Sequence, residues 1–145
     1  MARWLAALLL AIATALPAAA QEQQIGQINT TTGTVTVERA GQHLPLKIGD
    51  PIYRQDVVET GKDSSVGIIF VDNSVFSTGP ESRLALDQFH FDSTNFHGDM
   101  LARLQKGTLS VVSGDIARSS PGSMKIQTPT AILGVRGTTF AVEVK

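Results

Sequence analysis

The side chains best suited to chemistry in this 145-residue sequence are His90, Asp92, His97 and Asp99. Imidazole nitrogens and carboxylate oxygens bind divalent metals, and these four residues lie within a span of ten. If His90 and Asp92 share one face of a strand, the turn after them can bring His97 back toward them. Their spacing matches no closed metal site, and a strand with one buried side needs a polar outer face in any case. We therefore predict a polar surface here, with neither a metal nor another cofactor.

Three further acidic residues, Asp50, Asp56 and Glu59, are candidates for a general acid and base. Nothing in the sequence fixes their separation, and no aromatic cluster accompanies them to form a pocket. Asp50 is expected to bond turn amides, and Asp56 and Glu59 are expected to face solvent. The sequence has no nucleophile elbow, phosphate-binding loop or zinc-protease helix, and it contains no cysteine. We predict a protein that is not an enzyme, without catalytic residues.

Residues 128–140, which read TPTAILGVRGTTF, combine several backbone constraints. Pro129 fixes its own φ and pushes Thr128 into an extended conformation. Gly134 and Gly137 permit backbone angles that other residues avoid. So many constraints predict a fixed corner that joins two extended segments.

Arg136 is the one charged residue in this corner. Its planar guanidinium can bind backbone carbonyls or a carboxylate such as Glu81 in a two-pronged manner, which would be a structural role. Alternatively, it can hold an acidic group of a partner protein. Because glycines flank it closely, we favour the structural role.

The elements that must position these residues are short strands. Alternating apolar and polar residues, separated by turn residues every few positions, begin at Gly33. Asp72-Asn73-Ser74 is typical of a tight connection, and a change of buried face near Asp87-Gln88 predicts a bulge. Residues 99–106 fit either a strand or a helix, and residues 116–123 predict a loop. About ten short strands without a long helical segment predict a single all-β domain, either a sandwich or a solenoid-like coil.

The first twenty residues have the pattern of an export signal. Arg3 supplies a positive start, an apolar run follows, and small residues precede a cleavage site after Ala20. We expect a mature chain that begins at Gln21, is periplasmic or secreted, and has no membrane span after cleavage. Residues 21–32 predict a polar leader that can add an edge strand but builds no core, and residues 33–145 form the β domain.

The charge of the expected mature chain points to no nucleic-acid partner. Loss of Arg3 with the signal leaves eleven basic and thirteen acidic residues, a net charge of −2 spread evenly along the chain. Nucleic-acid binding requires a basic patch, so we predict no such interaction.

Three segments of the sequence resemble FecR-like domains, the periplasmic module of iron-transport signalling regulators. They read IGDPIYRQDVVETGKDSSVGIIFVDNSVFSTGPESRLALDQFHF, LQKGTLSVVSGDI and TPTAILGVRGTTFAVEV, and they follow the family's order. The resemblance covers roughly residues 33–144. It implies a solenoid-like coil in preference to a sandwich, and a strand at residues 99–106.

The resemblance also implies a function in the cell envelope. FecR regulators add an anti-sigma segment, a transmembrane helix and a further C-terminal domain, and this chain carries an export signal in place of the first two. We therefore expect a non-enzymatic exported module for protein interaction or accessory signalling, whose partner is another envelope protein. The alternative is a carbohydrate or cell-wall binding module that binds a surface polysaccharide. Aromatic platforms for a sugar are few, because the one tryptophan lies in the signal and Tyr53 is the one tyrosine. In either case Thr128, Pro129, Gly134, Arg136 and Gly137 are the residues of interest.

Overall fold

The computed structural model describes residues 23–137 and 139–145, so the predicted signal at residues 1–20 lies outside it. The strands are β1 (Gln24–Thr32), β2 (Val35–Arg39), β3 (Gln42–Pro45), β4 (Pro51–Tyr53), β5 (Val57–Thr60), β6 (Ser65–Phe70), β7 (Val75–Thr78), β8 (Arg83–Phe91), β9 (Gly98–Val112), β10 (Met124–Gln127), β11 (Ile132–Val135) and β12 (Thr139–Val144). One short helix, α1 (Asp115–Ser119), connects β9 to β10. Within the described ranges, no helix is long and apolar enough to cross a membrane.

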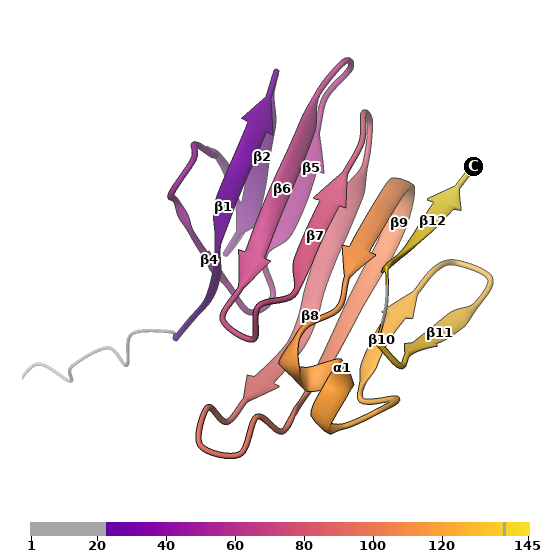
Figure 1. Cartoon of the computed structure of the whole chain (residues 1–145). Helices are drawn as coiled ribbons and strands as arrows, with labels where there is room; N and C mark the ends of the chain where they lie inside the picture. Colours follow the sequence, from indigo (N-terminus) through magenta and orange to yellow (C-terminus); the bar gives the residue numbers. More distant parts are fainter. Residues whose placement is uncertain (1–22, 138) are drawn as a thin grey trace, which may run out of the picture.

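The strands form one curled open sheet that resembles half of a barrel. Its order is β3-β2-β5-β8-β9-β7-β6-β1-β4. Outside this order, β10 and β12 each pair with β9, and β11 pairs with β10. Strand pairs are antiparallel, apart from the parallel pair of β9 and β10. Figure 1 shows the result of the curl, with β1 and β6 lying in front of β2 and β5.

The core fills the space inside this curl. Phe70 and Phe76 meet edge to face with ring centroids 4.8 Å apart, and Phe70 stacks on Phe89 at 5.6 Å. The sheet has two arms that meet at β9: one holds β8, β5, β2 and β3, and the other holds β7, β6, β1 and β4. The rings come from β6 and β7 on one arm and from β8 on the other, so they join the two arms, together with the fully buried Leu84 and Leu104. Burying a side chain of this size stabilises the fold by roughly 2 kcal/mol relative to leaving it exposed.

Strand β9 belongs to both arms, and it turns from one to the other at Gly107. Up to Lys106 it pairs with β8 and β10, and from Gly107 onward it pairs with β7 and β12. Gly107 has φ +91°, and a Cβ placed on it would lie 2.0 Å from Ser82 Oγ and 2.5 Å from Ser82 Cα. Both the backbone angle and the packing therefore require glycine at this bend.

A second fixed point is the turn between β6 and β7. Asn73 takes φ +68°, and the buried Asp72 carboxylate accepts hydrogen bonds from Ser74 N–H (3.0 Å), Ser74 Oγ (2.7 Å) and Ile116 N–H (3.3 Å). Gly114 packs so closely on this turn that a Cβ there would lie 2.3 Å from the Asp72 carbonyl oxygen. These contacts fix the start of α1 against the sheet.

The sequence predictions of the all-β class, of the turn at residues 72–74 and of a strand at 99–106 are confirmed. The predicted bulge is present as a register shift between Leu86 and Gln88. As in the predicted coil, the chain winds into one continuous sheet and not into two separate ones. Apart from β9 and β10, its neighbouring strands are antiparallel, and the curl gives the sheet the form of half a barrel.

Two predicted segments differ in the structure. The polar leader, residues 21–32, contributes β1, which lies between β4 and β6 and is no edge strand. Ile25 and Ile28 of β1 are buried in the core, and threonine-rich segments favour strands even when few residues are apolar. The predicted loop at residues 116–123 begins instead with α1, because Ile116 and Ala117 are buried against the sheet.

Candidate functional site

The β10–β11 hairpin carries the first half of the 128–140 motif. Its turn is closed by the Thr128 N–H bond to the Ala131 carbonyl (2.8 Å) and by the Ala131 N–H bond to Thr128 Oγ1 (3.1 Å). Pro129 is exposed at the tip, and Thr128 and Pro129 line a shallow hollow of about 150 Å³ beside Arg103. These two residues therefore shape the turn.

Strand β11 forms a free edge of the sheet. It pairs with β10 on one side, and no other described strand pairs with it (Figure 1). Ile132 is 64% exposed and Leu133 is 37% exposed, although Val135 at the end of the strand is buried. An edge strand presents unpaired N–H and C=O groups, so β11 combines free backbone groups with accessible apolar side chains.

The two glycines of the motif have different environments. Gly137 takes φ +94° at the corner between β11 and β12, and the nearest neighbour of an added Cβ is Ser113 Oγ at 3.8 Å. Gly134 lies inside β11 without a positive φ, and an added Cβ would meet only Gly122 Cα, at 4.0 Å. The corner thus needs Gly137 for its backbone angle, whereas Gly134 has no such requirement.

Arg136 is exposed and forms no hydrogen bond or ion pair with any residue at 23–137 or 139–145. The favoured clamp on a backbone carbonyl or on Glu81 is therefore not formed within those ranges. The reason is geometric: Arg136 is exposed and directly follows β11, which pairs with β10 alone among the described strands. The alternative role of Arg136, contact with a partner, remains a prediction.

Positive charge gathers around this edge. From residue 116 to residue 142 the sequence contains three cationic residues, Arg118, Lys125 and Arg136, and no acidic residue. Arg118 pairs with Asp115 at the start of α1. Lys125 is exposed on β10 directly opposite Gly134 and, like Arg136, has no ionic partner in the described part of the chain. The hairpin edge therefore carries two unpaired positive charges in a chain whose net charge is −1.

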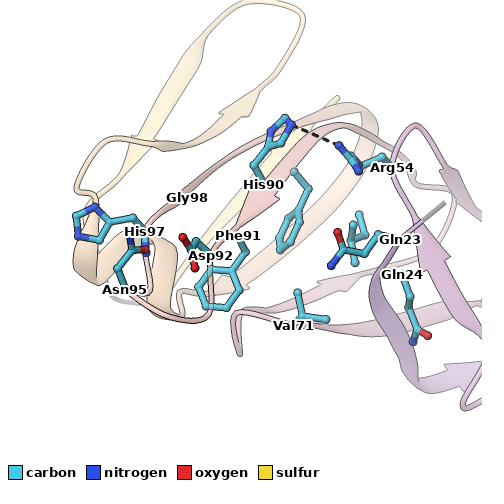
Figure 2. A pocket seen from close by; sticks show the side chains of 12 residues that line it. Gln23, Gln24, Arg54, Val71, His90, Phe91, Asp92, Asn95, His97 and Gly98 are labelled. Atoms are coloured by element: carbon cyan, nitrogen blue, oxygen red, sulfur yellow. Dashed lines mark hydrogen bonds between the residues drawn. The ribbon is translucent and has the colours of Figure 1, made fainter. Parts of the chain in front are cut away.

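The four candidate metal ligands do not converge. His90 Nδ1 lies 3.4 Å from Asp99 Oδ2, and His90 Nε2 lies 3.4 Å from Arg54 Nη1. Asp92 instead accepts bonds from the Thr94 hydroxyl and the Thr94 N–H, and these bonds lower the pKa of Asp92 below its ordinary value. Figure 2 shows His97 turned away from His90. No cation site is formed by these four residues.

His90, Asp92 and His97 line a hollow of about 430 Å³. Its walls mix apolar side chains such as Phe91 and Val71 with polar ones (Figure 2). The hollow is open to solvent, and its charged groups are of both signs.

A different set of ligand atoms does lie close together, on the outer face of the sheet. Atoms of Glu38, His43 and Glu59 are within 4.8 Å of one another. Arg83 forms ion pairs with both glutamates, at 3.0 Å to Glu38 and at shorter range to Glu59. One guanidinium therefore already balances the two carboxylates, which explains their proximity without a metal.

The acidic candidates are tied into the framework. Asp50 accepts the Lys47 N–H at 2.8 Å, which confirms its predicted turn role. The expectation that Asp56 faces solvent is wrong: it is 1% exposed, and both its oxygens bind Arg39, at 2.8 and 2.7 Å. The hydrogen bond to Asp56 also raises the pKa of Arg39. Residue 56 points inward because it begins the alternation of β5, and burying a carboxylate requires a partner.

Tyr53 is covered by the same arginine. The Arg39 guanidinium carbon lies 4.7 Å from the centre of the Tyr53 ring, in a cation–π contact. A sugar-binding platform needs an open aromatic face, and the Arg39 side chain occupies one face of Tyr53.

Sequence reasoning missed the bend at Gly107, the hydrogen bond that Asp72 accepts from Ile116 N–H, and the Arg39–Asp56 pair. Gly107 and Asp72 carried a local signal, since each lies among turn-forming residues. Arg39 and Asp56 lie 17 positions apart, and only the pairing of β2 with β5 brings these strands together.

The family model described as FecR protein matches residues 56–145. This range includes β5 to β12, and therefore the β10–β11 hairpin and Arg136. No curated protein and no solved structure matches the chain. The match begins later than the resemblance predicted, at Asp56, and it covers more than half of the sequence. The chain therefore belongs to the FecR protein family, whose members are associated with signalling.

Proposed function

We propose that this chain is a non-enzymatic, exported signalling-accessory module that acts by binding another protein of the cell envelope. The observation that carries the proposal is Arg136, an exposed and unpaired cation within the described residues, placed directly after the free apolar edge of β11. Aromatic or arginine side chains beside accessible apolar surface are typical of protein interfaces. Membership of a signalling-related family agrees with such a role.

The acidic candidates support binding over catalysis. Asp56 and Glu59 are each held by a guanidinium, and Asp50 by a backbone N–H. A general acid or base must reach a substrate proton, and these carboxylates are already occupied. The chemistry available at the β11 edge is recognition through charge, apolar contact and backbone hydrogen bonds.

Capture from an envelope extract of the native host tests the proposal. The immobilised chain 21–145 should retain a defined envelope protein, identified by mass spectrometry, and Arg136→Glu should retain much less of it. Lys62→Glu, an exposed charge reversal far from this edge in the sheet, is the matched control and should capture normally. If no protein is retained while a glycan array shows saturable binding, the carbohydrate module would replace this proposal.

The location is tested separately. Fractionation of the native host should place the protein in the periplasm or outside the cell, with Gln21 as its first residue. Recovery of the form that begins at Met1 from the cytoplasm would contradict export.

A further inference from the structure

The outer face of β11 has a gap in its row of side chains. Ile132 lies opposite Gln127 and Gly134 lies opposite Lys125, so these four residues share one face of the hairpin. Neither the backbone angle nor the packing of Gly134 requires a glycine, as described above. The absence of a side chain leaves open space between Lys125 and the free edge.

This gap gives Lys125 access to anything that pairs with β11. An added strand would lie about 4.8 Å beyond β11, and a lysine side chain can extend over a glycine to a residue on that strand. Arg136 follows two positions after Gly134, within the diagonal reach of long side chains in a sheet. Both unpaired cations can therefore approach one position on the added strand, the position opposite Gly134.

The opposite face of β11 offers an apolar contact. Leu133 pairs with Ile126, which is fully buried, yet Leu133 itself is 37% exposed. An apolar residue beside Leu133 on an added strand would continue the core outward by one strand.

We propose that the free edge of β11 binds an extended segment of another protein as an additional strand, with a carboxylate opposite Gly134 held by Lys125 and Arg136. The segment alternates apolar residues, facing Leu133, with polar and acidic ones. This inference rests on the proposed function and specifies its partner. Backbone hydrogen bonds supply affinity that is independent of sequence, and the carboxylate supplies selectivity.

Charge distinguishes this occupant from a second copy of the chain. A second copy would bring the same edge, which has cations and no acidic residue from 116 to 142. Like charges that meet across an interface are unfavourable, whereas an acidic strand neutralises Lys125 and Arg136.

Fluorescence anisotropy with labelled model peptides tests the proposal on the chain 21–145. The probe is a ten-residue peptide that alternates valine and threonine, with a glutamate at one central polar position. A second peptide carries lysine at that position, and a third keeps the glutamate but has a proline beside it to prevent strand pairing. We expect saturable binding of the glutamate peptide, weaker at high salt, and little binding of the other two.

Variants of the chain locate the site. Lys125→Glu and Arg136→Glu should each weaken the glutamate peptide about fivefold, the upper range for one exposed ion pair, and together they should reverse the preference toward the lysine peptide. Gly134→Thr should fill the gap and weaken the glutamate peptide without lowering the melting temperature. Ile132→Ser should weaken the glutamate peptide, whereas Ile48→Ser, which changes an equally exposed isoleucine in a loop, should leave its binding unchanged.

Equal binding of the glutamate and lysine peptides, or no saturable binding of either, would overturn the inference. So would a concentration-dependent dimer in sedimentation that Ile132→Ser dissociates, since a second copy would then occupy the edge. If envelope capture is weakened by Arg136→Glu but not by Lys125→Glu, Gly134→Thr or Ile132→Ser, the proposed function stands and only the strand-binding site is wrong.

Discussion

Arg83 and Arg136 show two uses of the same side chain in one sheet. Arg83 lies on the outer face of β8, between Glu38 and Glu59, and also bonds Gln105 of β9. Arg136 lies beyond the last residue of β11 and has no such partner among the residues described. The difference indicates that charges in the middle of the sheet hold strands together, whereas those at the β11 edge remain available. Substitutions in the two regions should therefore separate stability from binding.

The largest effect on stability is expected at the bend of β9. Gly107→Val should cost about 3 kcal/mol or more, because a side chain is strained at φ +91° and collides with Ser82. Gly41→Val is the matched control, since Gly41 has φ +76° with no neighbour within 4 Å, and should show the strain alone. Urea unfolding of both variants measures the difference. Equal losses would show that Ser82 yields easily and that the bend is less constrained than its packing indicates.

Asp56→Ala should have the next largest effect, a loss of about 2 to 3 kcal/mol. It leaves the Arg39 guanidinium, 32% exposed, without its carboxylate partner in a partly buried position. Glu38→Ala removes an ion pair with Arg83 whose carboxylate side chain is 34% exposed, against 1% for Asp56, and should cost less than about 1 kcal/mol. Thermal unfolding of the two variants in the same buffer compares them, and similar losses would mean that burial does not distinguish these pairs.

The glycines of the motif should differ from each other. Gly137→Val is expected to lose ~1 to 3 kcal/mol because valine is strained at φ +94°. Gly134→Val places a β-branched residue in a strand with open space around it and should change stability by less than about 0.5 kcal/mol. Melting temperatures of the pair decide the matter. A comparable loss for Gly134→Val would show that β11 is more tightly packed than its edge position indicates.

Arg136→Lys should have the smallest effect on stability, with no measurable change in the melting temperature. The side chain is exposed and unpaired within the described ranges, so shortening its reach removes no internal contact. The same variant should weaken capture of an envelope partner, because lysine lacks the planar two-pronged donor of arginine. A lower melting temperature would return Arg136 to the structural role that its sequence context suggests.

The sequence was sufficient where structure depends on neighbouring residues. The turn at Asp72-Asn73-Ser74 and the bulge near Gln88 follow from side chains within a few positions, and both are present. The strand positions follow from alternation in the same way.

It was insufficient where structure depends on distant pairing. Lys106-Gly107 has the composition of a turn between two strands, and only the approach of Ser82 makes it a bend within one. From its residue type alone, Asp56 is expected to face solvent, and only the pairing of β2 with β5 places Arg39 beside it. For the motif, residue types indicated the importance of Gly137 but gave Gly134 the same role, because a glycine does not reveal its own φ.

The single strand shared by both arms has a kinetic consequence. Strand β9 pairs with β7, β8, β10 and β12. The sheet therefore cannot be completed on either side of β9 until residues 98–112 have been synthesised and have paired. Most of these contacts join residues far apart in the sequence, and folding dominated by such contacts takes milliseconds to seconds. During that interval the edges of β7 and β8 that later receive β9 are open to other chains. Aggregation during folding should therefore depend on how promptly β9 arrives, a property that neither the stability of the finished sheet nor its binding edge determines.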